Sequence, residues 1–469
     1  MLFNSIQFLL IFLPVVLMTF NCAKQRSPRH AMVVLLVSSF VFYSWWDIRF
    51  TPMLALSILL NYSYGMFLVK NRQRRFLAFG IVLNLLPLIV FKYAGWLGGM
   101  VDAPIQSLVL PLGISFFTFL QIGYLTSAYK GTTESKGLLA YAVFVCYFPH
   151  LIAGPILRHK EVTEQLVGIP RSPILLDKTF ARGALLLAVG LFKKVIVADA
   201  LCAGYANETF AQARTVDFTE SWTGALAYSC QLYFDFSGYC EMALGMSMMM
   251  GIVIPINFAS PYRASNIGEF WRTWHMSLSS FFRDHVYIPL GGNRRGLPVQ
   301  LGGIALTFAL TGIWHGAGWT FLAWGCLHAT YLIVFRLWSR WGVALPVTLA
   351  KIVTLGCVVF AWVLFRATTI EEALAMWRSM LGFNGFTLGI GFTQFSEYLP
   401  ESVRFSDGRL VVGTELLLYG VLLGWCATAK NVHEFELKPT MTHAAGIGIL
   451  GLCSMLFISK VSTFLYWSF

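Results

Sequence analysis

The sequence predicts an all-α polytopic integral membrane protein, with roughly eleven to thirteen transmembrane or re-entrant helices. Only 12% of the 469 residues are charged and 57% are hydrophobic, whereas soluble domains carry about 25% charged residues. Apolar runs close to the ~18–20 residues that cross a bilayer recur along the whole chain. These runs are residues 5–21, 32–46, 52–69, 76–91, 106–126, 138–154, 183–201, 223–254, 299–314, 317–335, 349–365, 411–428 and 443–460.

Residues 1–469 are predicted to form one integral membrane domain, because no segment between the apolar runs is long or polar enough for a separate soluble domain. The first run begins at Asn4 without a preceding basic region or a following small-residue cleavage site. This pattern indicates a retained span rather than a cleaved signal peptide. The nine cysteines are scattered singly, mostly inside apolar runs, which favours buried, reduced thiols.

The positions of the basic residues predict the orientation, because Lys and Arg near the ends of spans tend to stay in the cytoplasm. Basic clusters lie at 24–29 and 70–75, and others lie at 336–351 and 430–438. This places both termini outside the cytoplasm, with the charge-balanced segment 366–410 also external. The run 138–154 has basic residues on both sides. A re-entrant or membrane-surface segment would resolve that conflict.

The first candidate for chemistry is residues 314–319, Trp-His-Gly-Ala-Gly-Trp, between the apolar runs 299–314 and 317–335. Those runs are predicted to form a hairpin that places His315 at membrane depth, where polar side chains are costly. Gly316 allows close approach of a ligand, and Trp314 and Trp319 would exclude water. A neutral imidazole there can take a proton from a hydroxyl. The alternative is a histidine hydrogen-bonded between helices.

The second candidate is the polar, aromatic-rich stretch 269–295. Glu269, Arg272, His275 and Arg283 alternate with aromatic residues in a helix-like pattern that is too polar to face lipid. A glycine- and arginine-rich turn follows at 291–295, and guanidinium groups with backbone N–H groups suit phosphate oxygens. The alternative is a basic loop that lies on anionic headgroups.

Two further segments carry polar groups within apolar sequence. Asp235 and Glu241 lie in the run 223–254 and need partners, for which the arginines of 269–295 are candidates; the alternative is a structural ion pair. Prolines and a glycine in 148–158 suit a broken, re-entrant segment, with Arg158 as a candidate ligand contact. No metal site is predicted, because His315 and His328 have no carboxylate or thiol at metal-ligand spacing.

These motifs, taken in order, resemble the membrane-bound O-acyltransferase family, and in particular its bacterial branch of alginate O-acetylation membrane proteins. The resemblance includes 111–119, 148–158, 233–239, 271–295, 314–319 and the terminal Phe464-Leu465-Tyr466. It differs at Ser127, where the branch usually has aspartate, and at His285, where tyrosine is more usual. The resemblance implies a ring of helices around a funnel-shaped centre, a catalytic half at about 106–340, His315 as the catalytic histidine and His275 as its assistant.

The resemblance also implies an activity at the bacterial inner membrane. We expect acetyl transfer from cytoplasmic acetyl-CoA, used as a substrate and not as a permanently bound cofactor, to an extracytoplasmic polysaccharide through a periplasmic or membrane-anchored partner. Arginines suit the phosphates of CoA, and the candidates are Arg158, Arg263, Arg272, Arg283, Arg294 and Arg295. Alternatives are O-acylation of peptidoglycan or teichoic acid, a transporter for polysaccharide or lipid-linked sugar, and a structural subunit of a synthase complex.

Overall fold

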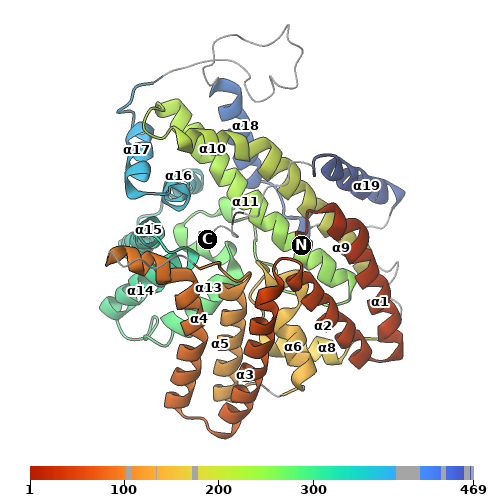
Figure 1. Ribbon diagram of the computed structural model, residues 1–469. Helices are drawn as coiled ribbons and strands as arrows, with labels where there is room; N and C mark the ends of the chain where they lie inside the picture. The colour runs from red at the N-terminus through yellow and green to blue at the C-terminus, as the bar shows by residue number, and fades with distance from the viewer. Residues whose placement is uncertain are drawn as a thin grey trace. The chain divides into compact units, whose positions relative to one another are not determined.

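The computed structural model describes residues 1–101, 108–133, 135–171, 178–386, 412–434, 440–458 and 465. Within these ranges every regular element is a helix (Figure 1), as the sequence predicts. Residues 387–410 of the segment expected to be external lie outside the described ranges, as do Phe464 and Tyr466.

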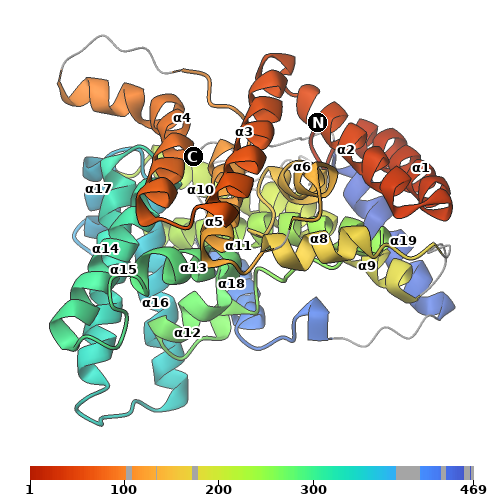
Figure 2. The ribbon, with the colours of Figure 1, turned by 90° about the horizontal axis from the view of Figure 1, so that it is seen from below.

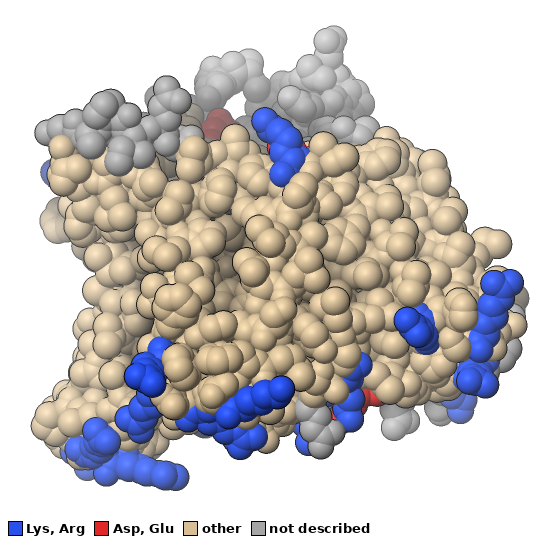
Figure 3. Space-filling view, turned by 60° about the horizontal axis from the view of Figure 1, so that its bottom comes forward, with Lys and Arg blue, Asp and Glu red and all other residues tan. Residues whose placement is uncertain are grey.

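In the part of the chain that the structure describes, six helices are long and apolar enough to cross a membrane. Their ranges are Phe8–Arg26, Ile48–Lys70, Arg74–Met100, Leu297–His315, Trp319–Trp338 and Val347–Arg366. Shorter apolar helices lie at Pro28–Ser44, Glu415–Cys426 and Ala444–Leu456. Figure 3 shows a wide surface of uncharged residues, with Lys and Arg confined to small groups. Such a surface suits lipid as the solvent, and the chain is a multi-pass membrane protein.

The chain forms two compact units and passes between them at several points, one of which lies within helix α11 (Phe218–Met249). Unit 1 contains Met1–Phe192, Gly238–Ile256 and Glu436–Ser468. Its elements are η1 (Phe8–Phe12), α1 (Leu13–Arg26), α2 (Pro28–Ser44), η2 (Ile48–Phe50), α3 (Thr51–Lys70), α4 (Arg74–Met100), α5 (Ile114–Lys130), α6 (Leu138–Cys146), α7 (Phe148–Leu151), α8 (His159–Val167), α9 (Lys178–Phe192) and α19 (Met441–Leu456). Helices α9 and α19 pack against each other although they are far apart in the sequence.

The run 138–154, which has basic residues on both sides, forms a broken helix in unit 1. Helix α6 ends at Cys146, because Tyr147 leaves the helical region with φ −51° and ψ 109° and Pro149 follows. The four-residue helix α7 then continues the chain, and Nε2 of buried His150 lies 3.0 Å from the carbonyl oxygen of Phe144. This confirms a broken, buried segment; its re-entrant path through the membrane stays a prediction.

Unit 2 contains Lys193–Ser237 and Asn257–Phe435. Its elements besides the first part of α11 are η3 (Lys193–Ala203), α10 (Gly204–Ala211), η4 (Pro261–Arg263), α12 (Ile267–Thr273), α13 (Met276–Phe282), η5 (Arg283–Tyr287), α14 (Leu297–His315), α15 (Trp319–Trp338), α16 (Val347–Arg366), α17 (Ile370–Met380), α18 (Val412–Cys426) and η8 (Val432–Glu434). Helices α14, α15 and α16 lie side by side in both ribbon views (Figures 1 and 2). This confirms the predicted hairpin around His315.

Two glycines let α14 and α15 approach closely. A Cβ on Gly312 would overlap the carbonyl oxygen of Phe321, and a Cβ on Gly325 would overlap the carbonyl oxygen of Phe308. Because both obstacles are backbone atoms, neither can move aside without shifting a whole helix. The close helix pair therefore sets the position of His315 at the end of α14.

We expect Gly312→Ala to lower the free energy of unfolding by about 1–3 kcal/mol, the usual cost of overpacking. Gly302→Ala on the same helix is the matched control, because a Cβ there meets nothing within 4 Å. Alanine also has the higher helix propensity, so the control should be neutral or slightly stabilised. Thermal unfolding of both purified variants in detergent measures the difference, and equal midpoints would contradict the packing argument.

Candidate active site

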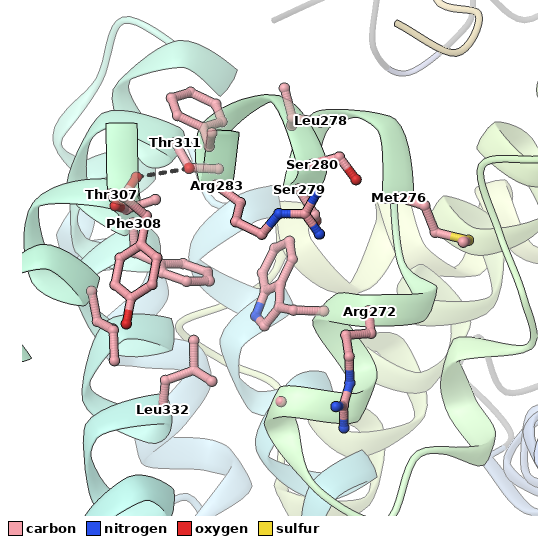
Figure 4. Close-up of a pocket in the computed structure, with 15 residues that line it drawn as sticks. Arg272, Met276, Leu278, Ser279, Ser280, Arg283, Thr307, Phe308, Thr311 and Leu332 are labelled. Carbon is pink, nitrogen blue, oxygen red and sulfur yellow. Dashed lines mark hydrogen bonds between the residues drawn. The ribbon is translucent and has the colours of Figure 1, made fainter. Parts of the chain in front are cut away.

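A pocket of about 440 Å³ lies within unit 2, between α12, α13, η5, α14 and α15 (Figure 4). Its volume falls in the usual range for small-molecule sites. Apolar and aromatic side chains make up most of its lining. The lining residues are Gly268, Trp271, Arg272, Met276, Leu278, Ser279, Ser280, Phe282, Arg283, Tyr287, Ile304, Thr307, Phe308, Thr311 and Leu332.

One face of α14 connects this pocket to His315. Thr307 and Thr311 line the pocket, and each hydroxyl donates to the carbonyl oxygen four residues earlier, at 2.6 and 2.8 Å. These bonds satisfy the hydroxyls within the helix, as the dashed line in Figure 4 shows for Thr311. His315 follows Thr311 by four residues, so its side chain belongs to the same helix face. His315 itself is not among the lining residues and lies one helical turn beyond Thr311.

His315 is enclosed by aromatic rings and is only 2% exposed. Its ring centroid lies 4.9 Å from that of Trp314 and 5.1 Å from those of Trp324 and Phe365. Gly316 follows in extended conformation, and the ring of Phe321 occupies the place where its Cβ would be. The glycine therefore serves aromatic packing beside the histidine. Buried Trp314 covers His315 as expected, whereas Trp319 is 56% exposed at the start of α15 and does not wall off the site.

His275 precedes α13 in a left-handed backbone conformation, with φ 43° and ψ 54°. Such a conformation is uncommon outside glycine and indicates a constrained position. The imidazole is fully buried, and its Nδ1 lies 3.3 Å from Oδ1 of Asn257, which accepts hydrogen bonds. Nδ1 is then the donor, and Nε2 carries the lone pair. The indole of Trp314 lies 6.2 Å from the His275 ring, so it neighbours both histidines.

Burial lowers the pKa of His275 to about 3. Its folded pKa is depressed relative to the unfolded value of about 6.5, so the unfolded chain binds the extra proton between pH 6.5 and 3. We expect stability to fall as the pH drops through this window, by up to about 1.4 kcal/mol per pH unit from His275. Urea or thermal unfolding at pH 6.5 and 4.5 should show a smaller decrease in His275→Gln than in wild type. The exposed His30 supplies the control, because His30→Gln should keep the wild-type decrease.

Two of the six candidate arginines line the pocket, namely Arg272 and Arg283. Figure 4 shows Arg283 near the Thr307–Thr311 side and Arg272 farther from it. Nε of Arg283 donates to Oδ1 of Asp284 at 2.8 Å, which leaves its terminal nitrogens for other acceptors. Arg263 lies outside the lining, with Nη1 3.7 Å from Oε1 of Glu434.

The other predicted residues have different surroundings. Arg294 and Arg295 are exposed in the turn after η5 and do not line the pocket. Arg158 belongs to unit 1, where it lies 3.8 Å from Glu161; Glu241 also belongs to unit 1 and is buried. These roles stay predictions.

Asp235 takes part in a structural ion pair, the alternative that the sequence left open. Its carboxylate forms a buried ion pair with Lys194, which also donates to Asp199 at 2.9 Å. Lys194 and Asp199 belong to the π-helix η3, whereas Asp235 belongs to α11. A buried charge needs such a partner in an apolar surrounding.

Sequence reasoning missed Thr307, Thr311, Ser279 and Trp271 as lining residues of the pocket. The spacing of Thr307, Thr311 and His315 at four-residue intervals was the available signal, because such residues share one helix face. Trp271 belongs to the aromatic-rich stretch 269–295, but its place in the pocket depends on how α12 packs against α14 and α15.

The comparisons with known proteins identify the family of the chain. Residues 16–371 match the model of the membrane-bound O-acyltransferase family. The chain is 37% identical to the peptidoglycan O-acetyltransferase of Helicobacter pylori, over 100% of this chain and 98% of that protein. It is 38% identical to the probable alginate O-acetylase AlgI of Pseudomonas aeruginosa, over 95% of this chain and 84% of that protein. It is 31% identical to the teichoic acid D-alanyltransferase of Streptococcus thermophilus, over 60% of this chain and 69% of that protein. The chain therefore belongs to the membrane-bound O-acyltransferase family and is an O-acyltransferase.

Proposed function

We propose that this enzyme moves an acetyl group from cytoplasmic acetyl-CoA to an extracytoplasmic polysaccharide, through a periplasmic or membrane-anchored partner. It would act in the inner membrane with both termini in the periplasm. The observation that carries the proposal is the arginine-bearing pocket lined by Thr311 of α14, one helical turn before buried His315. A transporter or docking subunit gives no reason for a buried histidine one helical turn beyond such a pocket.

The pocket suits a CoA thioester by its division into charged and apolar parts. The guanidinium groups of Arg272 and Arg283 can each donate two parallel hydrogen bonds to a phosphate. Trp271, Phe308 and Leu332 offer an apolar wall for the pantetheine arm and the short acyl group. Exclusion of water from this wall would strengthen the polar contacts that remain.

His315 would act as the general base in the transfer. Its imidazole takes the proton of the acceptor hydroxyl while the hydroxyl oxygen attacks the thioester carbonyl carbon. The carbon–sulfur bond breaks, CoA leaves as the thiolate, and the proton from His315 returns to that sulfur. His275, neutral because of its low pKa, would support the reaction from beside Trp314 without adding a positive charge.

The acceptor class has two candidates. The motif resemblance favours an exopolysaccharide of the alginate type. Peptidoglycan is the second candidate, because the alignment with the Helicobacter pylori protein spans 98% of that relative, against 84% for the alginate protein of Pseudomonas aeruginosa. Both acceptors offer sugar hydroxyls, so the same chemistry at His315 serves either one.

The test uses the purified full chain in nanodiscs with radiolabelled acetyl-CoA. Alginate oligosaccharides and soluble peptidoglycan fragments are offered as separate acceptors, with membranes of the source cell as a supply of partner proteins. Transfer to one acceptor identifies its class. Binding of acetyl-CoA with transfer only after membranes are added supports the need for a partner. Absence of both binding and transfer under all conditions would contradict acetyl-CoA as the donor.

A further inference from the structure

A third histidine, His328 on α15, is held in the core of unit 2 by one hydrogen bond. Its side chain is completely buried. The indole Nε1 of Trp271 donates to its Nδ1 at 3.3 Å. Because an indole nitrogen can only donate, Nδ1 must carry the lone pair and the neutral ring carries its proton on Nε2. Trp271 thus selects one tautomer of His328.

Several aromatic rings lie around His328. The ring centroids of Trp324 and Trp271 lie 4.9 and 5.0 Å away, and those of Tyr331 and Trp362 lie 5.7 and 6.1 Å away. Among the described residues Nε2 has no hydrogen-bond partner. An apolar pair of similar shape at 271 and 328 would cost little stability. Folding alone therefore gives a weak reason for an imidazole in this place.

Trp271 gives the stronger reason, because its indole forms part of the pocket wall. It packs edge-on against the ring of Phe308, another lining residue, with centroids 5.0 Å apart. The torsion that rotates an indole about its attachment has two broad minima. Packing against flat rings tolerates both orientations, whereas a hydrogen bond from Nε1 to a fixed acceptor is satisfied in only one.

We propose that His328 is a positioning residue that orients the indole of Trp271 through this hydrogen bond and so shapes the wall of the acyl-donor pocket. The inference rests on the proposed function for the use of the pocket by the donor. Loss of one net hydrogen bond corresponds to roughly a tenfold effect. Because Trp271 touches the pocket rather than the reacting atoms, the loss should fall on KM for acetyl-CoA, with kcat within about twofold of wild type.

The experiment is a double-mutant cycle on the full chain. His328→Leu removes the acceptor, Trp271→Phe removes the donor, and the double variant removes both. His328→Asn is the conservative variant, because its amide oxygen can accept near the place of Nδ1. We expect each single variant to raise KM about tenfold, the double variant to match the single ones, and His328→Asn to stay within about twofold of wild type. Additive effects, or a failure of Asn to rescue, would overturn the proposal.

A second measurement separates this proposal from the proposed function. In ¹⁵N-tryptophan-labelled protein, the indole N–H resonance that disappears in Trp271→Phe belongs to Trp271. This resonance should move in His328→Leu and return toward its wild-type position in His328→Asn, whether or not the protein uses acetyl-CoA. An unmoved resonance would overturn the role of His328. An inactive wild type with a moved resonance would instead contradict the proposed donor. If His328→Leu lowers kcat, and kcat stays low when Trp271→Phe is added, His328 acts through Trp324 instead. This outcome would also overturn the proposal.

Discussion

His315→Ala should lower acetyl transfer by about 10²–10⁴-fold, the usual contribution of a general base. The alanine variant cannot accept the proton of the acceptor hydroxyl, so the neutral hydroxyl must attack the thioester unaided. The aromatic cage of Trp314, Trp324 and Phe365 remains in place. The affinity for acetyl-CoA should therefore change by only a few-fold. The measurement is acetyl transfer and acetyl-CoA binding by the same preparation.

Two further variants distinguish loss of the base from loss of folding. His315→Gln keeps much of the buried volume and a polar group but is not a base at neutral pH, so it should be as inactive as the alanine variant. His30→Ala, at an exposed position near the start of α2, should keep wild-type transfer. Near-normal transfer by either His315 variant would remove His315 from the mechanism.

The double variant Arg272→Gln/Arg283→Gln should raise KM for acetyl-CoA by about 10². A hydrogen bond to a charged group contributes about 1.5–3 kcal/mol, and each glutamine replaces a charged fork by a neutral donor. The kcat value should change less than KM, because the phosphates of CoA are remote from the thioester carbon. Steady-state transfer at varied acetyl-CoA concentration measures both constants.

A truncated donor makes this test specific for the phosphates. S-Acetyl-pantetheine carries the thioester but no phosphate, so wild type and the double variant should use it with the same KM. Arg340→Gln removes an exposed charge outside the pocket lining and controls for the net charge of the protein. An equal loss with both donors would mean that the arginines support the pocket rather than bind phosphate. Arg294→Gln/Arg295→Gln in the same assay tests the neighbouring turn.

The pocket was only partly predictable because side chains meet there from separate segments. The stretch 269–295 offered several arginines of equal standing, and only Arg272 and Arg283 line the cavity. Which residues of a helix face a neighbouring helix depends on how the two helices are rotated and shifted against each other in the packed core. Trp271 and His328 illustrate this point, since 57 residues separate two side chains that share a hydrogen bond.

The sequence by itself determined the features that depend on local pattern. Low charge and recurrent apolar runs require helices in lipid, because each helix satisfies its own backbone hydrogen bonds. The Trp-His-Gly-Ala-Gly-Trp segment between two apolar runs likewise determined the hairpin that ends α14 at His315. Only the tertiary structure decided the pairings across long stretches of chain, such as Asp235 with Lys194 and Trp271 with His328. The reason is physical: periodicity along a helix is a property of neighbouring residues, whereas the partner of a buried polar group is chosen by packing between helices.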